Sequence, residues 1–384
     1  YPYYLYVYYY GCGMAKTLTK LNRDDALYCA GIFNDYFGQF DKIDQYMRDQ
    51  KLAQLDDTVS ASLPGMGPEE DIFNDFSISP EDMNFEVYEP ADIQHYVTLL
   101  NMTSSHTNMA SIPGKELKLL VKETNTGKIV GFIRFGSPVI NSAPRNQVLG
   151  QVPDLKQFNK TSIMGFTIVP TQPFGYNYLG GKLLAAICCS HHVREMLNKK
   201  YNMNLCMFET TSLYGSSKSS SQYDGMKPYL RFKGVTDSKF VPLMHGQPYR
   251  DLNNYVEDRV GLLVPVGASS RKLKMTTAVI GLLKRSLEGD DLTKFKKTIE
   301  GALALTERKR FYVSNYGIEN YIDIVNGKTD TIKRAENWDR FELDNVVAWW
   351  KKHATKRFNN LTLDGRLRTK LEIWSKESQI DIIR

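Results

Sequence analysis

The chain has 384 residues and a mass of 43.9 kDa. A hydrophobic fraction of 42% and a charged fraction of 24% are ordinary for globular proteins, and they exclude collagen, coiled coil and wholesale disorder. No run of about 18 apolar residues occurs, so we expect no membrane-spanning helix and no membrane partner. The five cysteines are an odd number at no metal-ligand spacing, which favours a reduced, intracellular protein without a bound metal.

The formal net charge of +6 combines three regions of different sign. Residues 14–92 carry a net charge of −11, residues 93–249 carry +10, and residues 250–384 carry +7. A basic body of this size attracts polyanions, and nucleic acid is the commonest of them in a cell. The alternative is a basic surface that only keeps the protein soluble. The acidic region either covers the basic body or forms a solvated helical layer, and charge does not separate the two.

The first 13 residues, YPYYLYVYYYGCG, carry seven tyrosines in their first ten positions. They have no basic segment and no cleavage pattern of a secretory signal. Met14 then opens a conventional protein start. We interpret residues 1–13 as a non-native or leader peptide; if they are native, the tyrosines would suit an edge strand.

Residues 14–83 are predicted to form an acidic helical region followed by a linker. Apolar residues recur at helical spacing over 17–55, and Asn22 before two aspartates suits a helix N-terminus. Proline and glycine then mark residues 56–83 as a loop.

Residues 84–245 have a denser α/β pattern. Asn125, Thr126 and Gly127 form a predicted hairpin turn between two alternating apolar runs. The expected strands are 85–88, 115–122, 128–135, 162–169 and 205–210, and the expected helices are 90–100, 178–197 and 223–232.

Residues 246–384 read as a basic, mainly helical C-terminal domain. The expected helices are 271–286, 291–304, 344–358 and 366–374, with short strands at 310–313 and 321–325. Runs such as RKRFY at 308–312 interleave cations with aromatics, a pattern suited to phosphates and stacked bases. Trp349 and Trp350 would either wedge between bases or pack an amphipathic helix on its domain.

The most informative motif runs from strand to turn to helix over residues 162–197. Gly175 lies in the loop, and Gly180 and Gly181 open the helix. Helix N-termini carry unsatisfied N–H groups and positive potential, and small residues allow a phosphate to approach the backbone. The motif therefore predicts a pyrophosphate seat, or else a tight connection between strand and helix.

The order of this motif between a strand hairpin and a later strand resembles the GNAT acyltransferase fold. The resemblance implies an α+β class: a GNAT-like mixed sheet flanked by helices, with a helical N-terminal region and a mostly α C-terminal domain. It implies acyl-CoA or a related activated donor as cofactor. The usual basic-x-x-Gly-x-Gly/Ala signature is replaced here by Gln-Pro-Phe-Gly-Tyr-Asn-Tyr. By the resemblance, the donor pyrophosphate would contact Phe174, Gly175, Tyr176, Asn177, Tyr178, Gly180 and Gly181.

A narrower resemblance covers residues 95–240. The IVGFIRFG strand, and a late Tyr223-to-Lys227 element that closes at Gly234-Val235-Thr236, are similar to Mom-type phage DNA-modification proteins and to DruA-type proteins of Druantia defence systems. This resemblance implies DNA as partner, a role in phage anti-restriction or defence, and the cytoplasm of a bacterial host cell.

Four residues are candidates for catalysis: Glu209, Tyr223, Ser212 and Asp224. Glu209 ends an apolar strand where the sheet would open, and is either a general base or a structural carboxylate paired with an arginine. Tyr223 is a general acid, a base-stacking platform or a core residue. Asp224 would orient a substrate or lie on a solvated face, and Ser212 begins a serine-rich loop that would order on substrate.

Candidate nucleic-acid contacts share a cationic side chain or a position near the sheet edge: His106, Arg134, Arg145, Lys227 and Arg231. The arginines are suited to fork phosphates or carboxylates. His106 lies in a polar loop, where a histidine is either a substrate contact or simply exposed. Cys188 and His192 share a helix face, which suits either a metal or helix packing.

Two functions follow from these patterns. The first is a GNAT-like transferase that modifies a nucleobase in DNA, with Glu209 and Tyr223 moving protons. The alternative is a non-catalytic or nuclease-like DNA-binding component of a phage-defence system. The sequence does not set the oligomeric state.

Overall fold

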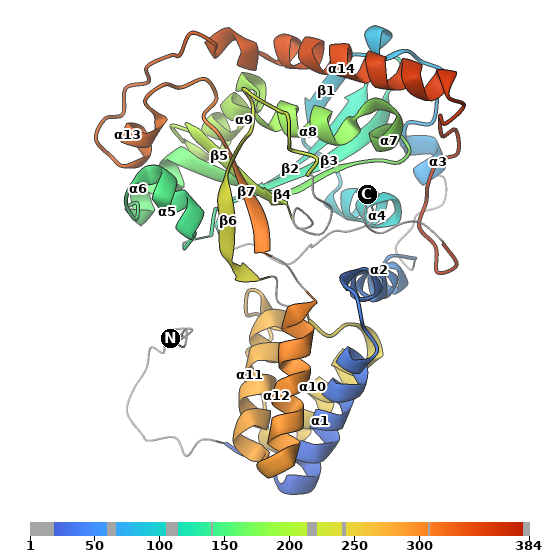
Figure 1. Cartoon of the computed structure of the whole chain (residues 1–384), viewed down its shortest axis with the longest axis vertical. Helices are drawn as coiled ribbons and strands as arrows, with labels where there is room; N and C mark the ends of the chain where they lie inside the picture. Colours follow the sequence, from blue (N-terminus) through green and yellow to red (C-terminus); the bar gives the residue numbers. More distant parts are fainter. Residues whose placement is uncertain are drawn as a thin grey trace. The chain divides into compact units, whose positions relative to one another are not determined.

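The computed structural model describes residues 19–59, 67–104, 114–139, 141–212, 221–239, 243–305 and 308–378. Its contacts divide the chain into two units, each of which combines separate stretches of sequence (Figure 1). The helical unit comprises residues up to 39 together with 247–300, and the sheet unit comprises 40–246 together with 301–384. Within the described ranges, no helix has both the length and the apolar character needed to cross a bilayer.

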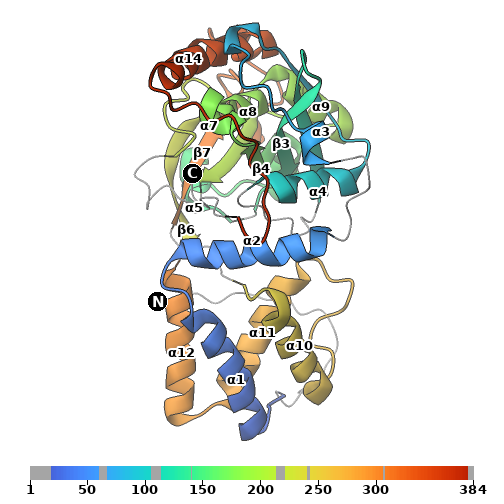
Figure 2. The ribbon, with the colours of Figure 1, turned by 90° about the vertical axis from the view of Figure 1, so that its right-hand side faces the viewer.

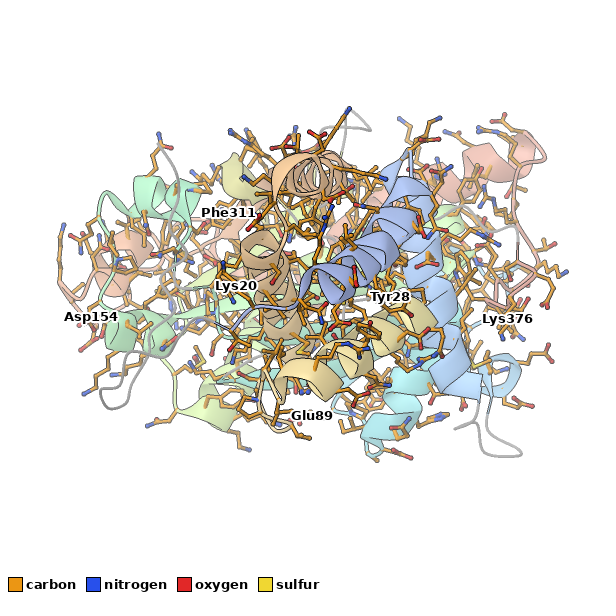
Figure 3. All side chains as sticks on the ribbon, turned by 90° about the horizontal axis from the view of Figure 1, so that it is seen from below. Lys20, Tyr28, Glu89, Asp154, Phe311 and Lys376 are labelled. Atoms are coloured by element: carbon orange, nitrogen blue, oxygen red, sulfur yellow. The ribbon has the colours of Figure 1, made fainter. Side chains whose placement is uncertain are left out.

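The helical unit consists of α1 (Arg23–Gly38), α10 (Gly246–Val260), α11 (Arg271–Ser286) and α12 (Gly289–Ala304), shown in Figure 2. Asn22 caps α1 by accepting a hydrogen bond from the Asp25 amide at 2.8 Å, as its sequence position predicts. The Asp25 carboxylate accepts 2.7 Å bonds from Tyr255 and Arg259 of α10. The ring of Tyr28, labelled in Figure 3, lies 4.2 Å from that of Tyr255, so polar and aromatic contacts join the two helices.

The sheet unit is built on a seven-stranded sheet in the order β1-β2-β3-β4-β5-β7-β6. Among the seven strands of the described residues, β4 and β5 pair in parallel and the other neighbouring strands pair antiparallel. Parallel strands need a crossover, which α7 (Phe174–Tyr178), α8 (Gly180–Cys188) and α9 (His191–Tyr201) supply. The strands are β1 (Phe85–Tyr88), β2 (Glu116–Glu123), β3 (Lys128–Gly136), β4 (Ser162–Pro170), β5 (Met207–Ser212), β6 (Arg231–Lys239) and β7 (Arg308–Ser314).

The pairing of β4 with β5 ends at Gly165 and Thr210. Beyond this point β4 continues to Pro170 and remains paired with β3. The two strands therefore separate over the second half of β4.

The two faces of the sheet are covered by different helices. On one face α8 packs against β3 and β4, and α14 (Leu343–Leu363) covers α8. On the other, α4 (Ile93–Thr103) contributes Tyr96 to a cluster with Leu120 and Phe132. Because strand residues alternate between faces, neighbouring Leu119 and Ile133 belong to the core on the α8 side.

Glycines in the strands allow α8 to lie close to the sheet. A Cβ atom on Gly131 would lie 2.4 Å from Cδ1 of Leu184, and one on Gly165 would lie 2.9 Å from the Phe208 ring. Cβ atoms do not approach other heavy atoms this closely. The spacing between α8 and the sheet therefore depends on Gly131, and the packing of the Phe208 ring over β4 depends on Gly165.

The remaining short helices lie around the sheet or connect its parts. Helix α13 contacts α5 and α6, and α5 contacts β6. The bounds are α2 (Ile43–Val59), α3 (Pro68–Asp71), η1 (Pro80–Asp82), α5 (Ala143–Leu149), α6 (Leu155–Thr161), α13 (Tyr321–Val325) and η2 (Trp338–Phe341).

The α+β class with a mixed sheet is confirmed, as are the hairpin of β2 and β3 and strands β1, β4, β5 and β7. The single helix predicted for 178–197 is wrong. Leu179 has a left-handed backbone (φ 54°) that ends α7, and Ser190 caps a new helix, so three helices form.

Three other local predictions differ from the structure. Residues 321–325 are helical, residues 366–374 contain no helix, and 223–232 form turns that lead into β6. The two units divide the chain after residues 39, 246 and 300. The chain after residue 300 belongs to the sheet unit because β7 pairs with both β5 and β6.

We predict that Gly131→Ala destabilises the sheet unit by about 1–3 kcal/mol, because the added methyl group overpacks the core at Leu184. Urea unfolding followed by circular dichroism measures the free energy of unfolding. Gly301→Ala is the matched control, since no atom lies within 4 Å of its added Cβ. Equal stability of the two variants would contradict the close packing of α8.

Candidate functional site

The turn predicted to seat a donor is packed into the core. Phe174, Asn177 and Tyr178 are fully buried. The Tyr178 hydroxyl donates to the Ile78 carbonyl at 3.0 Å, and its ring stacks on Phe358 of α14 at 5.2 Å. Trp350 donates its indole N–H to the Tyr178 carbonyl at 2.8 Å. The helix α14 therefore covers this turn.

The segment after α14 holds the same turn by polar contacts. The Asn177 side chain donates to the Arg368 carbonyl at 2.6 Å and accepts from the Arg368 amide at 3.1 Å. The guanidinium groups of Arg357 and Arg368 lie 4.8 and 3.9 Å from the centre of the Tyr176 ring. Tyr176 and Asn177 thus bind the chain's own C-terminal segment.

Side chains pack closely against the glycines of this turn. A Cβ on Gly175 would lie 2.5 Å from Gln172, one on Gly180 would lie 2.7 Å from Phe174, and one on Gly181 would lie 2.4 Å from Gln222. Of the two interpretations of this motif, the geometry favours the tight connection. Side chains of the protein itself lie against all three glycines.

Glu209 is 1% exposed and forms a buried ion pair with Arg145 of α5. The Arg145 Nη1 donates to Oε1 at 3.0 Å, and the guanidinium lies 4.3 Å from the Phe158 ring centre. Burial raises the pKa of Glu209 to about 7, although the charge and hydrogen bond of Arg145 oppose the shift. The second oxygen, Oε2, is buried with no hydrogen-bond partner.

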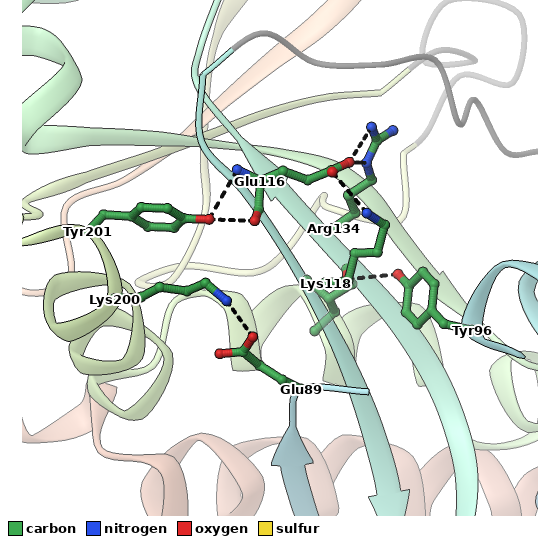
Figure 4. A network of polar contacts seen from close by, with 8 residues as sticks. Glu89, Tyr96, Glu116, Lys118, Arg134, Lys200 and Tyr201 are labelled. Atoms are coloured by element: carbon green, nitrogen blue, oxygen red, sulfur yellow. Dashed lines mark hydrogen bonds and ion pairs between the residues drawn. The ribbon is translucent and has the colours of Figure 1, made fainter. Parts of the chain in front are cut away.

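Arg134, also predicted to bind nucleic acid, is held in an intramolecular network (Figure 4). It is 2% exposed, and its Nε donates to Glu116 at 2.6 Å. Lys118 lies 2.9 Å from the other oxygen of Glu116. Burial alone would raise the pKa of Glu116, but the two cations lower it overall. Arg134 therefore pairs with a half-buried carboxylate and Arg145 with a fully buried one.

Glu209 and Tyr223 lie on opposite faces of the sheet. Glu209 and Thr210 are consecutive in β5, so their side chains point in opposite directions. Burial raises the pKa of Tyr223, and a hydrogen bond to Thr210 partly offsets the rise. The Tyr223 ring lies 5.3 Å from that of Tyr312, which pairs with Thr210. The predicted acid–base pair of Glu209 and Tyr223 therefore does not share one site.

Asp224 fastens the turn before β6 to strand β7. It accepts hydrogen bonds from the Tyr312 hydroxyl at 2.7 Å, from Arg310 at 3.3 Å and from the Ser221 amide at 2.9 Å. Burial opposes ionisation, but these partners lower the pKa of Asp224 overall. The Arg310 guanidinium also lies 4.3 Å from the ring centre of Phe232, which is 45% exposed.

Cations and aromatic rings gather along β6, β7 and the turn before them. The predicted domains separate Arg231 from the RKRFY run at 308–312, because no local sequence pattern shows that β7 pairs with β6. Lys227, Arg231 and Arg308 are exposed, and Lys233 and Arg310 are half-buried. We define the β6–β7 surface as Lys227, Arg231, Phe232, Lys233, Arg308 and Arg310.

The remaining predicted residues lie apart from this surface or carry no evident role. Ser212 pairs with Arg310 in the ladder of β5 and β7 and is half-buried. His106 lies outside the described residues. Cys188 is fully buried at the end of α8, whereas His192 is exposed on α9, so the two residues do not share one helix face. In the described ranges, no three or more His, Cys, Asp or Glu side chains form a group that could hold a metal.

The raised pKa of Glu209 predicts a pH-dependent stability. The ordinary value is 4.5, so between pH 4.5 and about 7 the folded state keeps a proton that the unfolded chain releases. Relative to Glu209→Gln, the wild-type free energy of unfolding should fall as pH rises through this window, by at most about 1.4 kcal/mol per pH unit. It should level off above pH 7. Urea titrations at a series of pH values measure this difference.

Glu116→Gln is the control of opposite sign, because the pKa of Glu116 is lowered. The stabilisation from Glu116 is present above its ordinary pKa of 4.5 and is lost as pH falls through the folded value. If the free energy of unfolding depends on pH in the same way for the wild type and for Glu209→Gln, burial does not shift the pKa of the Glu209 carboxyl.

Comparison with known proteins gives one family. Residues 78–218 match the family model "Druantia protein DruA". The curated Druantia protein DruA of Escherichia coli (strain UMEA 4076-1) is 28% identical over 153 residues, covering 34% of this chain and 38% of that protein. The match thus spans well under half of the relative's length, and no solved structure matches. The Mom-type and GNAT-like parts of the resemblance stay predictions. The stretch from β1 through β5 is accordingly similar to Druantia protein DruA.

Proposed function

We propose that the chain is a DNA-binding component of a bacterial phage-defence system of the Druantia kind. The similarity of residues 78–218 to Druantia protein DruA supports the defence role. The observation that carries DNA binding is the β6–β7 surface, which combines exposed cations with the partly exposed ring of Phe232, beside which the half-buried Arg310 lies.

The chemistry of this surface suits a polyanion with stacked rings. Arg231 and Arg308 are exposed, and arginine guanidinium groups bind phosphate oxygens through paired N–H groups. Phe232 offers a ring already backed by Arg310, and exposed aromatic rings accept bases of any sequence. We therefore expect binding with little sequence preference and a strong dependence on salt.

We predict that the logarithm of the association constant for duplex DNA falls linearly with the logarithm of salt concentration, with a slope of about −0.9 per phosphate contacted. The double variant Arg231→Ala/Arg308→Ala should weaken binding and make the slope shallower by about two. Fluorescence anisotropy of a labelled duplex measures both. Lys156→Ala removes an exposed cation of α6 and should change neither. No binding at low salt, or equal losses in all variants, would reject the proposal.

A DNA-modifying transferase is the second candidate, and one observation favours it. Glu209 lies one residue before the point where β4 and β5 separate, and its pKa near 7 suits a general base. The crossover by α7 to α9 between these strands is also the order that the GNAT resemblance implies. Since α14 and the C-terminal segment fill the 174–181 turn, an acyl donor would need another seat or displacement of that segment.

The two candidates separate by the fate of DNA in cells that express the protein. The transferase predicts a new nucleoside in digested DNA, detected by mass spectrometry, that disappears in Glu209→Gln and persists in Glu336→Gln, an exposed control. Binding alone predicts unaltered nucleosides together with salt-dependent duplex binding. A new nucleoside that survives Glu209→Gln would remove Glu209 from the chemistry.

A further inference from the structure

A pocket of about 430 Å³ lies between the Lys227–Tyr229 segment and the start of α14. Its lining includes Lys227, Tyr229, Arg340, Asn345 and Trp349. We propose that this pocket binds one nucleotide, with its base against Trp349 and Tyr229 and its phosphate at Lys227 and Arg340. The proposal rests on the proposed function for the source of the nucleotide, a DNA strand, but the pocket's chemistry stands on its own residues.

The aromatic walls are fixed before any ligand arrives. Tyr229 is 2% exposed, and its hydroxyl donates to the Arg340 carbonyl at 3.1 Å. The ring of Trp349 lies 5.1 Å from that of Tyr229 at 70°, and 4.9 Å from that of His353. Trp349 nevertheless remains half-buried, whereas Trp350, one residue on, lies fully in the core. A held but accessible indole offers a stacking face at small cost in side-chain entropy.

The rim of the pocket is polar and cationic. Lys227 and Arg340 are exposed, and neither forms an ion pair with another described residue. Asn345 is oriented by a 2.7 Å bond from its Nδ2 to the Asp339 carbonyl. Two cations suit a phosphate, and the Asn345 amide together with Asp339, which also lines the pocket, offers donor and acceptor groups to a base edge.

Size and position are consistent with this ligand. The volume falls within the range of about 300–1,000 Å³ usual for small-ligand pockets. Lys227 belongs to both the pocket and the β6–β7 surface, so a strand bound to that surface would pass the mouth of the pocket. The ligand is therefore a free nucleotide or a base turned out of a bound strand.

The test uses the full chain and four probes: deoxyadenosine, deoxyadenosine monophosphate, a five-nucleotide single strand and a duplex. We expect Trp349→Ala to weaken binding of the monophosphate and the single strand about tenfold, and Trp349→Phe to keep most of the affinity. Lys227→Ala should lower affinity for the monophosphate but not for deoxyadenosine. Lys352→Ala, an exposed cation on the same helix outside the pocket, is the control and should have no effect. Thermal melting confirms that each variant is folded.

The outcomes distinguish this proposal from the proposed function. If monophosphate binding depends on Trp349 and the duplex does not bind, the nucleotide pocket is supported and the DNA-binding role is rejected. Duplex binding, with the monophosphate and single strand indifferent to Trp349→Ala, would overturn the pocket. If Trp349→Ala loses binding of the monophosphate but keeps binding of the single strand, the pocket is assigned to a free nucleotide rather than to a strand.

Discussion

The close approach of α8 to the sheet is the constraint on which the sheet unit depends. At Gly131 of β3 there is no space for a Cβ, because Leu184 of α8 packs directly on the backbone there. Helix α8 is apolar over most of its length and needs cover on its outer side as well. Helix α14 supplies that cover, with Trp350 buried and bonded to the Tyr178 carbonyl. Sheet, α8 and α14 therefore form successive layers (Figure 1).

Local signals in the sequence predict much of this architecture. Alternating apolar residues predict β2 and β3, and Asn125 to Gly127 predicts the turn between them. Gly175, Gly180 and Gly181 fit two structures equally well, because a phosphate seat and a tightly packed turn require the same small residues. What separates the two is Trp350, which lies 172 residues from Tyr178 in the chain. No local pattern carries that information.

The candidate site shows the same limit. Residue type left Glu209 open between a general base and a carboxylate paired with an arginine. Only the fold pairs Glu209 with Arg145 and Arg134 with Glu116. Glu209 and Thr210 point to opposite faces of β5, and Tyr223 lies on the Thr210 face. The sequence does not show which face Tyr223 occupies, so it did not separate Tyr223 from Glu209. The pocket at Trp349 joins segments more than 100 residues apart, so its aromatic walls have no shared signal in the sequence.

The position of β7 in the sheet has a consequence during synthesis. Strand β5 leaves the ribosome with one edge unpaired, and β6 follows with no neighbour, until β7 has emerged at residues 308–314. In the interval the ribosome makes helices α10 to α12, which belong with α1 to the helical unit. Exposed strand edges invite pairing with other chains. The nascent protein is therefore most vulnerable to aggregation during this interval, and chaperones would act on it before translation ends.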